Sequence, residues 1–178
     1  MPRAHGNVLE IGVGTGLNLP FYNGARATKV TGIDPSEALL AHARRRATGA
    51  PVATELVCGR AEDLPFETES FDSAVITYSL CSVDDPVRVL AEVRRVLRPG
   101  GELLFVEHGL ARDAATQRRQ RWLTPMWRRV AGGCRLDRDI ASLMHGAGFA
   151  SVELSADYAA GAKFLSFTYQ GSARKLAQ

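Results

Sequence analysis

The sequence predicts an α/β protein with a doubly wound, Rossmann-like sheet of seven mostly parallel strands and an antiparallel edge. Apolar runs of strand length alternate with amphipathic segments along most of the chain, which is typical of a parallel sheet covered by helices. The first run, residues 8–11, ends in alternating glycines at Gly12, Gly14 and Gly16. The second run ends in Asp34, where an open α/β sheet presents a carboxylate to ribose hydroxyls. These features predict a nucleoside site.

The expected elements alternate between strand and helix. We expect strands near residues 7–12, 29–34, 53–59, 71–77, 102–108, 151–155 and 164–170. We expect helices near residues 16–21, 36–47, 85–97 and 137–147. Ser36 is a favourable N-cap for the second helix, and a short glycine-containing turn region separates the last two strands. The alternation places the ligand at the carboxyl ends of the strands, and the last two strands predict the antiparallel edge.

The spacing of the glycines distinguishes two classes of nucleoside ligand. Turns that bind dinucleotides follow G-x-G-x-x-G, whereas this turn reads G-x-G-x-G and continues with Leu17. Glu10 stands two residues before the first glycine. Its carboxylate would repel a pyrophosphate and attract an ammonium group, directly or through a water. S-adenosylmethionine carries an adenosine, a sulfonium and an amino group, so the motif predicts this ligand.

The glycine-rich turn and the segments after it resemble the class I S-adenosylmethionine-dependent methyltransferases. Residues 59–66, which read Gly-Arg-Ala-Glu-Asp-Leu-Pro-Phe, and residues 70–72 are similar to the third-strand exit of the ubiquinone/menaquinone-biosynthesis type of small-molecule methyltransferase. Residues 89–101 match the helix and turn before the fifth strand of that family, and the resemblance covers roughly residues 8–149. It implies one methyltransferase domain over residues 1–178, with S-adenosylmethionine as cofactor.

The resemblance completes the expected cofactor site. In that family the loop after the third strand brackets the adenine ring, which implies contacts from the backbone of Ala61 and the side chain of Glu62. The expected cofactor-binding residues are Glu10, Gly12, Gly14, Gly16, Asp34, Pro35, Ala61, Glu62 and Thr77. The chain departs from the family at Arg60, where many relatives carry an acid. Few residues precede the first strand, so we expect the N-terminal segment that covers the cofactor in relatives to be short or missing, which leaves a more open site.

Three further segments resemble the subgroup of alkyl-thiol methyltransferases more narrowly. They are Leu80-Cys81-Ser82-Val83, Glu107-His108 and Gly132-Gly133-Cys134-Arg135-Leu136. This resemblance implies a thiol acceptor. His108, expected at the carboxyl end of the fifth strand, is the candidate catalytic base, and the alternative is a structural histidine hydrogen-bonded beside Glu107. Cys81, Trp122 and Trp127 are the candidate substrate-lining residues.

Residues 112–135, from Arg112 to Arg135, carry the strongest charge signal. This segment holds seven arginines and one acid, so its net charge is +6 in a chain whose total is +3. Its apolar residues recur at helical spacing, namely Trp122, Met126 and Val130 with Leu123 and Trp127 beside them. Pro125 is expected to split the segment into two helices. Three interpretations stay open: an amphipathic helix packing its tryptophans on the domain, a cover over the substrate, or contact with an anionic membrane surface.

The remaining features exclude several classes. The chain shows no apolar run of the ~18 residues that a membrane span needs and no signal peptide before the first strand. Three cysteines without metal-ligand spacing indicate a reduced, cytoplasmic protein with no metal site. Residues 77–80, Thr-Tyr-Ser-Leu, differ from the Asn/Asp-Pro-Pro-aromatic run of base-modifying relatives, so no nucleic acid partner is expected. Nothing in the chain indicates an oligomeric state.

The sequence therefore predicts methyl transfer from S-adenosylmethionine to a small-molecule acceptor, with a thiol favoured. Methylation of an amine lipid headgroup or of a quinone precursor is the alternative within this class. Two other classes stay open. A nicotinamide-dependent oxidoreductase would share the fold and Asp34 but not Glu10 or the glycine spacing, and a non-catalytic nucleoside-binding module would keep the turn without acceptor chemistry.

Overall fold

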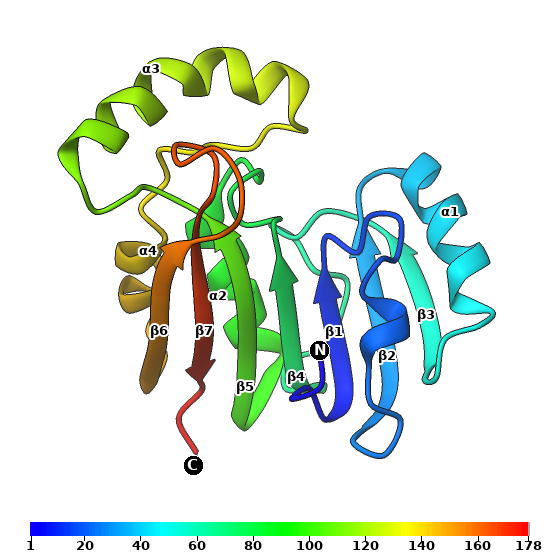
Figure 1. The fold of residues 1–178 in the computed structure, drawn as a ribbon. Helices are drawn as coiled ribbons and strands as arrows, with labels where there is room; N and C mark the ends of the chain where they lie inside the picture. Colours follow the sequence, from blue (N-terminus) through cyan, green and yellow to red (C-terminus); the bar gives the residue numbers. More distant parts are fainter. Residues whose placement is uncertain (178) are drawn as a thin grey trace.

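Seven strands form one sheet in the order β3-β2-β1-β4-β5-β7-β6 (Figure 1). The computed structural model describes residues 1–177. The strands are β1 (Gly6–Ile11), β2 (Ala27–Asp34), β3 (Ala53–Cys58), β4 (Phe71–Thr77), β5 (Leu97–His108), β6 (Ser151–Tyr158) and β7 (Phe167–Arg174). The first five in sequence pair in parallel, and β7 runs antiparallel to both β5 and β6. The predicted fold class is confirmed.

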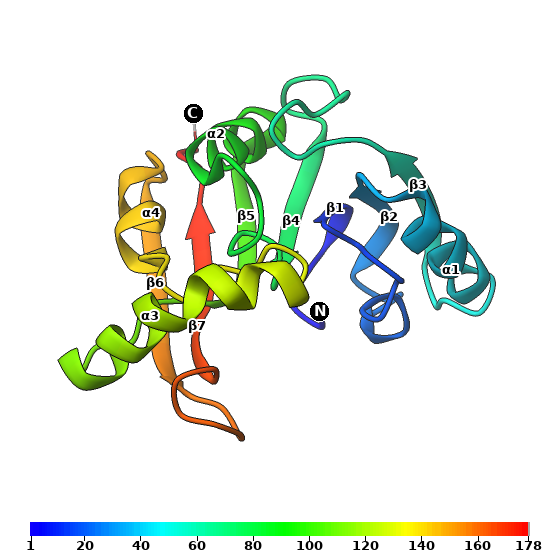
Figure 2. The ribbon, with the colours of Figure 1, turned by 90° about the horizontal axis from the view of Figure 1, so that it is seen from above.

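Helices cover both faces of this sheet. They are the 3-10 helix η1 (Leu19–Phe21) and the α-helices α1 (Glu37–Ala47), α2 (Pro86–Val96), α3 (Ala114–Val130) and α4 (Ile140–Gly146). In the view from above, α2 and α4 lie on one face of the sheet and α3 crosses over its end (Figure 2). Among the described residues, the search for a helix with the length and apolar character to cross a membrane finds none.

Each face of the sheet has its own apolar core. Leu9 and Ile11 of β1 are buried with side chains of α2 and α4, whereas Val8 is buried with Leu19 of η1 and Leu40 of α1. Successive residues of a strand point to opposite faces, so a strand covered on both sides has to be apolar at every position. The central strands β1 and β4 are apolar at most positions, with Glu10 and Ser73 as buried polar exceptions, and their carboxyl ends lie at one rim of the sheet.

Two predicted helices differ in the structure. The helix expected at residues 16–21 is reduced to a turn and η1, since Gly16 has φ +79° and Pro20 follows closely. The segment that Pro125 was expected to divide is the single helix α3. Pro125 is exposed, and the hydroxyl of Thr124 donates to the carbonyl of Gln120 at 2.7 Å. Pro125 has no N–H to donate to the carbonyl of Arg121. Arg121 is exposed, so water can bind that carbonyl and the helix continues through the proline.

Helix α3 lies over the carboxyl ends of the strands (Figure 1). The buried side chain of Gln120 attaches it there. The amide nitrogen of Gln120 donates to the carbonyl of Gly109 at 3.1 Å, and its oxygen accepts the N–H of Ala111 at 2.9 Å. Gln117 adds a bond of 2.8 Å to the carbonyl of Ala111. These bonds satisfy the loop after β5 with side-chain groups and thereby fix α3 above the sheet.

Candidate functional site

A cleft of about 460 Å³ opens where β1, β2 and β4 end. Seven of the nine predicted cofactor residues line it, namely Gly12, Gly14, Asp34, Pro35, Ala61, Glu62 and Thr77. The cleft therefore lies at the point where the connections from β1 and β4 leave toward opposite faces of the sheet, which is where open α/β sheets bind ligands.

The glycine turn leaves room for the backbone at one wall of the cleft. Gly12 has φ +65°, and a Cβ built on it would lie 2.1 Å from Oγ of Ser79. Gly12 is therefore required both by its left-handed conformation and by the close approach of the loop after β4. Gly14 has φ +54° but open space at its Cβ position. Of the two, only Gly12 packs against the opposite wall.

Asp34 is held in the cleft by two backbone groups. One carboxylate oxygen accepts the N–H of Gly14 at 3.0 Å, and the other accepts the N–H of Ser36 at 2.9 Å. Ser36 in turn caps α1 by accepting the N–H of Leu39. The carboxylate thus fixes the turn after β1 against the start of α1, and it stays at the cleft wall with both oxygens aligned.

Glu10 and Gly16 lie outside the cleft lining. The Glu10 carboxylate accepts bonds from the amide of Asn18 at 2.9 Å and from the hydroxyl of Tyr22 at 2.8 Å. Burial raises the pKa of Glu10 above its usual value, against the opposing effect of these two donors. Gly16 makes room for packing, because a Cβ there would lie 2.9 Å from a methyl carbon of Leu19.

Asn18 connects Glu10 to the cleft. Its amide also donates to the hydroxyl of Thr77 at 2.7 Å, and Thr77 lines the cleft at the end of β4. Sequence reasoning missed Asn18 and Tyr22, because neither belongs to the glycine motif. The signal was the pairing of a buried acid with the polar residues of the short segment that returns over it.

The adenine side expected at Ala61 and Glu62 is built around an ion pair. Arg60 contacts Asp84 at 2.7 Å and Glu62 at 3.3 Å, and the N–H of Asp84 donates to Glu62 at 3.2 Å. These contacts tie the loop after β3 to the residues before α2. Arg60, the departure from the family pattern, therefore closes the rim of the cleft.

Tyr78 separates His108 from the cleft. Tyr78 lines the cleft in a left-handed conformation with φ +51°, an uncommon geometry for a bulky residue. Its ring packs on the ring of His108 at a centroid distance of 4.5 Å. His108 is the last residue of β5, as expected, but it stands one side chain behind the cleft wall. Tyr78 belongs to none of the motifs that predict site residues.

Glu107 organises the loop after β4. Its buried carboxylate accepts the N–H groups of Ser79 at 2.8 Å, Leu80 at 2.8 Å and Cys81 at 3.0 Å. Burial raises the pKa of Glu107 to about 7, although the three N–H donors act in the opposite direction. Glu107 therefore sets the position of the residues that face Gly12 and the cleft.

Cys81 lies in a small apolar cluster beneath α3 rather than on the cleft wall. The cluster contains Cys81, Cys134 and Leu136, with Leu123, Trp127, Ala131 and Leu165 packed against it. The pKa of the Cys134 thiol is lowered by a hydrogen bond with the thiol of Cys81 and by the neighbouring His108. The same hydrogen bond and burial raise the pKa of Cys81. Of the two predicted substrate tryptophans, Trp127 packs against this cluster.

Trp122 points away from the site. Its side chain is 82% exposed, together with Met126 and Val130 on the same face of α3. The buried face of α3 carries Gln120 and Thr124 instead. A shift of two residues turns the direction of a side chain by about 200° on a helix, so these two stripes lie on opposite faces. Of the three interpretations of this segment, the one in which both tryptophans pack on the domain is wrong for Trp122.

The structure also brings together three possible metal ligands that the sequence does not group. Within the part of the chain that the structure describes, the donor atoms of Cys81, His108 and Cys134 lie within 4.8 Å of one another. These residues stand 26 or more positions apart, so no ligand spacing exists in the sequence. The fold assembles the group from the loop after β4, the end of β5 and the turn after α3.

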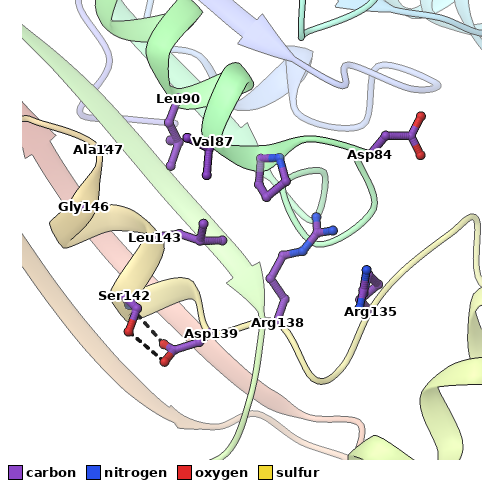
Figure 3. A pocket seen from close by; sticks show the side chains of 11 residues that line it. Asp84, Val87, Leu90, Arg135, Arg138, Asp139, Ser142, Leu143, Gly146 and Ala147 are labelled. Atoms are coloured by element: carbon purple, nitrogen blue, oxygen red, sulfur yellow. Dashed lines mark hydrogen bonds between the residues drawn. The ribbon is translucent and has the colours of Figure 1, made fainter.

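A second cavity, of about 520 Å³, lies between α2 and α4 (Figure 3). Val87, Leu90 and Leu143 point into it, and Asp84 stands at its edge. Arg138 donates to the carbonyls of Leu80 and Val83. This cavity shares Asp84 with the cofactor cleft but contains none of the predicted site residues.

Comparisons with known proteins agree on a family. A family model described as a methyltransferase domain matches residues 9–105. A phosphatidylethanolamine N-methyltransferase of Cereibacter sphaeroides is 46% identical over 110 residues, which are 61% of this chain and 53% of that protein. A thiol S-methyltransferase of Rattus norvegicus is 36% identical over 152 residues, which are 83% of this chain and 61% of that protein. The chain thus spans less than two thirds of either relative.

The fold has close counterparts among solved structures. An S-adenosylmethionine-dependent methyltransferase from Methanosarcina mazei superimposes with a TM-score of 0.75, over 99% of this chain and 95% of that one. The two sequences are 22% identical, so this likeness concerns the fold.

Proposed function

We propose a function for this chain, which belongs to the family of S-adenosylmethionine-dependent methyltransferases. The cleft at the ends of β1, β2 and β4 is the cofactor site in this proposal. Asp34 binds the ribose hydroxyls, and Ala61 and Glu62 hold the adenine. The fit rests on two observations: the carboxylate of Asp34 is fixed at the cleft wall by two N–H donors, and Gly12 keeps side-chain atoms out of the turn.

The reaction in this proposal is transfer of a methyl group to a small thiol. When bound, the cofactor supplies an electrophilic methyl group on a sulfonium that is a good leaving group. The protein has to align the acceptor in line with that bond and admit it as a thiolate. A free thiol has a pKa of ~8.5, so near neutrality it needs only modest help to lose its proton.

The observation that carries this proposal is the composition of one end of the cleft. Tyr78, Ser79, Ser82 and Gly132 line that end, and Ser82 and Gly132 come from segments that resemble the thiol-methylating subgroup. Behind them stand Cys81 and His108. The rat thiol S-methyltransferase is similar over 83% of this chain. His108 therefore belongs to the acceptor end as a supporting group behind Tyr78 rather than as a base that touches the acceptor.

Two measurements test the proposed function. Calorimetry compares binding of S-adenosylmethionine with binding of NAD, and we expect binding of the first alone. Turnover is then measured with small thiols, with primary amines and with quinone precursors at equal concentration. Methylation of thiols supports the proposal, whereas methylation of amines or quinone precursors alone overturns the acceptor assignment. Binding of NAD alone would overturn the reaction class.

A second candidate substrate, a lipid headgroup, is favoured by the outer face of α3. Trp122, Met126 and Val130 are 82%, 60% and 77% exposed, and the arginines of the segment flank them. Apolar side chains with basic neighbours on an exposed helix face are suited to the interface of an anionic bilayer. In this candidate function the bilayer presents an amine headgroup, which is the substrate class that the Cereibacter sphaeroides relative's name gives.

Vesicle sedimentation tests this second candidate. We expect binding to vesicles of phosphatidylglycerol and phosphatidylcholine, and weaker binding to phosphatidylcholine alone. Trp122→Ser should reduce binding. Phe21→Ser is the control and should leave binding unchanged, because it removes an aromatic residue that is 66% exposed but lies in η1 and not in α3. Equal sedimentation of all three proteins would remove the membrane contact. Methyl transfer to phosphatidylethanolamine in the same vesicles decides whether a lipid is a substrate.

A further inference from the structure

Three side-chain atoms that could bind a metal ion, two sulfurs and one nitrogen, converge beneath α3. The Sγ atom of Cys134 lies 3.8 Å from Nδ1 of His108, and the donor atoms of Cys81, His108 and Cys134 all lie within 4.8 Å of one another. In a tetrahedral zinc site, Zn–S bonds of about 2.3 Å and Zn–N bonds of about 2.0–2.1 Å place sulfur and nitrogen about 3.6 Å apart. The three donors therefore stand nearly at the separations that one ion requires.

Backbone hydrogen bonds hold each of the three donor residues in place. The N–H of Cys81 donates to Glu107 at 3.0 Å, and the carbonyl of Cys81 accepts the N–H of Arg135 at 3.0 Å. His108 ends β5 and pairs with β7. The N–H of Cys134 donates to the carbonyl of Ala131 at 3.0 Å at the end of α3. Ligands on fixed backbone need little rearrangement to bind an ion.

The donor set selects the class of ion. Two thiols and an imidazole suit zinc and other thiophilic ions, whereas magnesium and calcium require oxygen ligands. Cys81 and Cys134 are buried, at 1% and 7% exposure. Two thiolates in such surroundings need positive charge beside them, and a divalent ion supplies it.

We propose that Cys81, His108 and Cys134 bind one zinc ion. The three side chains are its protein ligands, and an exogenous ligand completes the tetrahedron on the side of His108, the most accessible of the three. The cysteines lose their protons when they bind, and those protons go to solvent. The ion joins the loop after β4, the end of β5 and the turn after α3, so it fixes the carboxyl-terminal end of α3 above the sheet. This inference does not depend on the identity of the acceptor.

Metal content is the first test. The full chain is expressed with added zinc, purified with a phosphine reductant, and analysed by plasma mass spectrometry. We expect one zinc ion per chain in the wild type and in Cys58→Ser, which changes an exposed cysteine outside the cluster. We expect loss of the ion in Cys81→Ser, Cys134→Ser and His108→Ala. Wild-type protein that contains no zinc and takes up none would overturn the proposal.

Measurements on the wild type remove the ambiguity of variants that fail to fold. Cobalt loading should give the thiolate-to-metal charge-transfer band and the visible bands of a tetrahedral thiolate site, and Cys58→Ser should give the same spectrum. Chelation should lower the melting temperature and increase hydrogen exchange in residues 114–135 more than in β1 or β2. An octahedral cobalt spectrum, or exchange that chelation leaves unchanged in residues 114–135, would overturn the site.

Discussion

The two walls of the cleft at the ends of β1, β2 and β4 are built in different ways. The wall formed by β1, β2 and the glycine turn consists of backbone, and Asp34 lies on it with both oxygens bound to N–H groups of neighbouring loops. The opposite wall, residues 78–82, depends on a buried side chain, because Glu107 accepts three of its N–H groups. On the first wall substitutions act by filling space, and on the second they act by releasing a loop.

The largest effect that this comparison predicts is at Glu107. Glu107→Ala leaves three N–H groups without their acceptor, each at a cost of about 1–3 kcal/mol. It also removes a carboxylate whose burial is unfavourable, and this removal offsets part of that cost. We expect a loss of about 3–5 kcal/mol in the free energy of unfolding, measured with urea. Glu107→Gln keeps one carbonyl oxygen and should lose less. A loss below about 1 kcal/mol for the alanine variant would show that the loop is held by other contacts.

A smaller effect is expected on the backbone wall at Gly12. Gly12→Ala combines a left-handed conformation with a Cβ that meets Ser79, which should cost about 2–4 kcal/mol of stability. Gly14→Ala is the matched control, because its φ is also positive but its Cβ position is open. Calorimetry should show a greater loss of S-adenosylmethionine binding for Gly12→Ala. Equal losses in the two variants would mean that the contact with Ser79 is unimportant.

Substitutions of Asp34 are expected to change the affinity for S-adenosylmethionine more than the stability of the fold. Asp34→Ala removes the charge-assisted contact that we propose with the ribose, so it should weaken binding of S-adenosylmethionine by about ten- to a hundredfold, or about 1.5–3 kcal/mol. Asp34→Asn keeps one acceptor for the N–H of Gly14 or Ser36 and should fold like the wild type. Unchanged affinity in a folded Asp34→Asn and Asp34→Ala pair would remove this residue from the cofactor site.

The smallest predicted effect is the pH dependence that comes from Glu10. Its pKa is raised in the folded protein, so the unfolded chain ionises first as pH rises, and folding stability falls between the ordinary carboxyl value and the folded one. Glu10→Gln lacks this term. The wild type should therefore lose stability relative to Glu10→Gln as the pH rises above the ordinary carboxyl pKa of 4.5. A constant difference in urea unfolding across this range would contradict the raised pKa.

Local sequence was sufficient for the backbone wall of the cleft. Gly12, Gly14 and Asp34 lie within 23 residues, and each consequence of their pattern concerns the chain immediately around them. The alternation of strands and helices gave the sheet and its antiparallel edge for a similar reason, because burial on two faces leaves a periodic signature. The predicted positions differ from the observed ones mainly at element ends, such as β5, which begins at Leu97 rather than residue 102.

The side-chain wall could not be predicted in the same way. Glu107 was noted as a neighbour of His108, but nothing in the sequence connects it to Ser79, 28 positions earlier. Trp122 was assigned to the substrate because helical spacing gives the members of a stripe without saying which stripe faces the domain. The buried stripe of α3 is polar, at Gln120 and Thr124, and its partners are loop carbonyls and N–H groups that hydropathy does not reveal.

The position of β7 has a consequence during protein synthesis. β7 is the last strand in the sequence but pairs between β5 and β6. Until residues 167–174 have left the ribosome, β5 presents an unpaired edge over much of its length, and β6 has no strand to pair with. An open edge of this kind can recruit strands from other nascent chains. The sheet therefore closes late, and protection against aggregation depends on how fast a single hairpin, β6 with β7, joins β5.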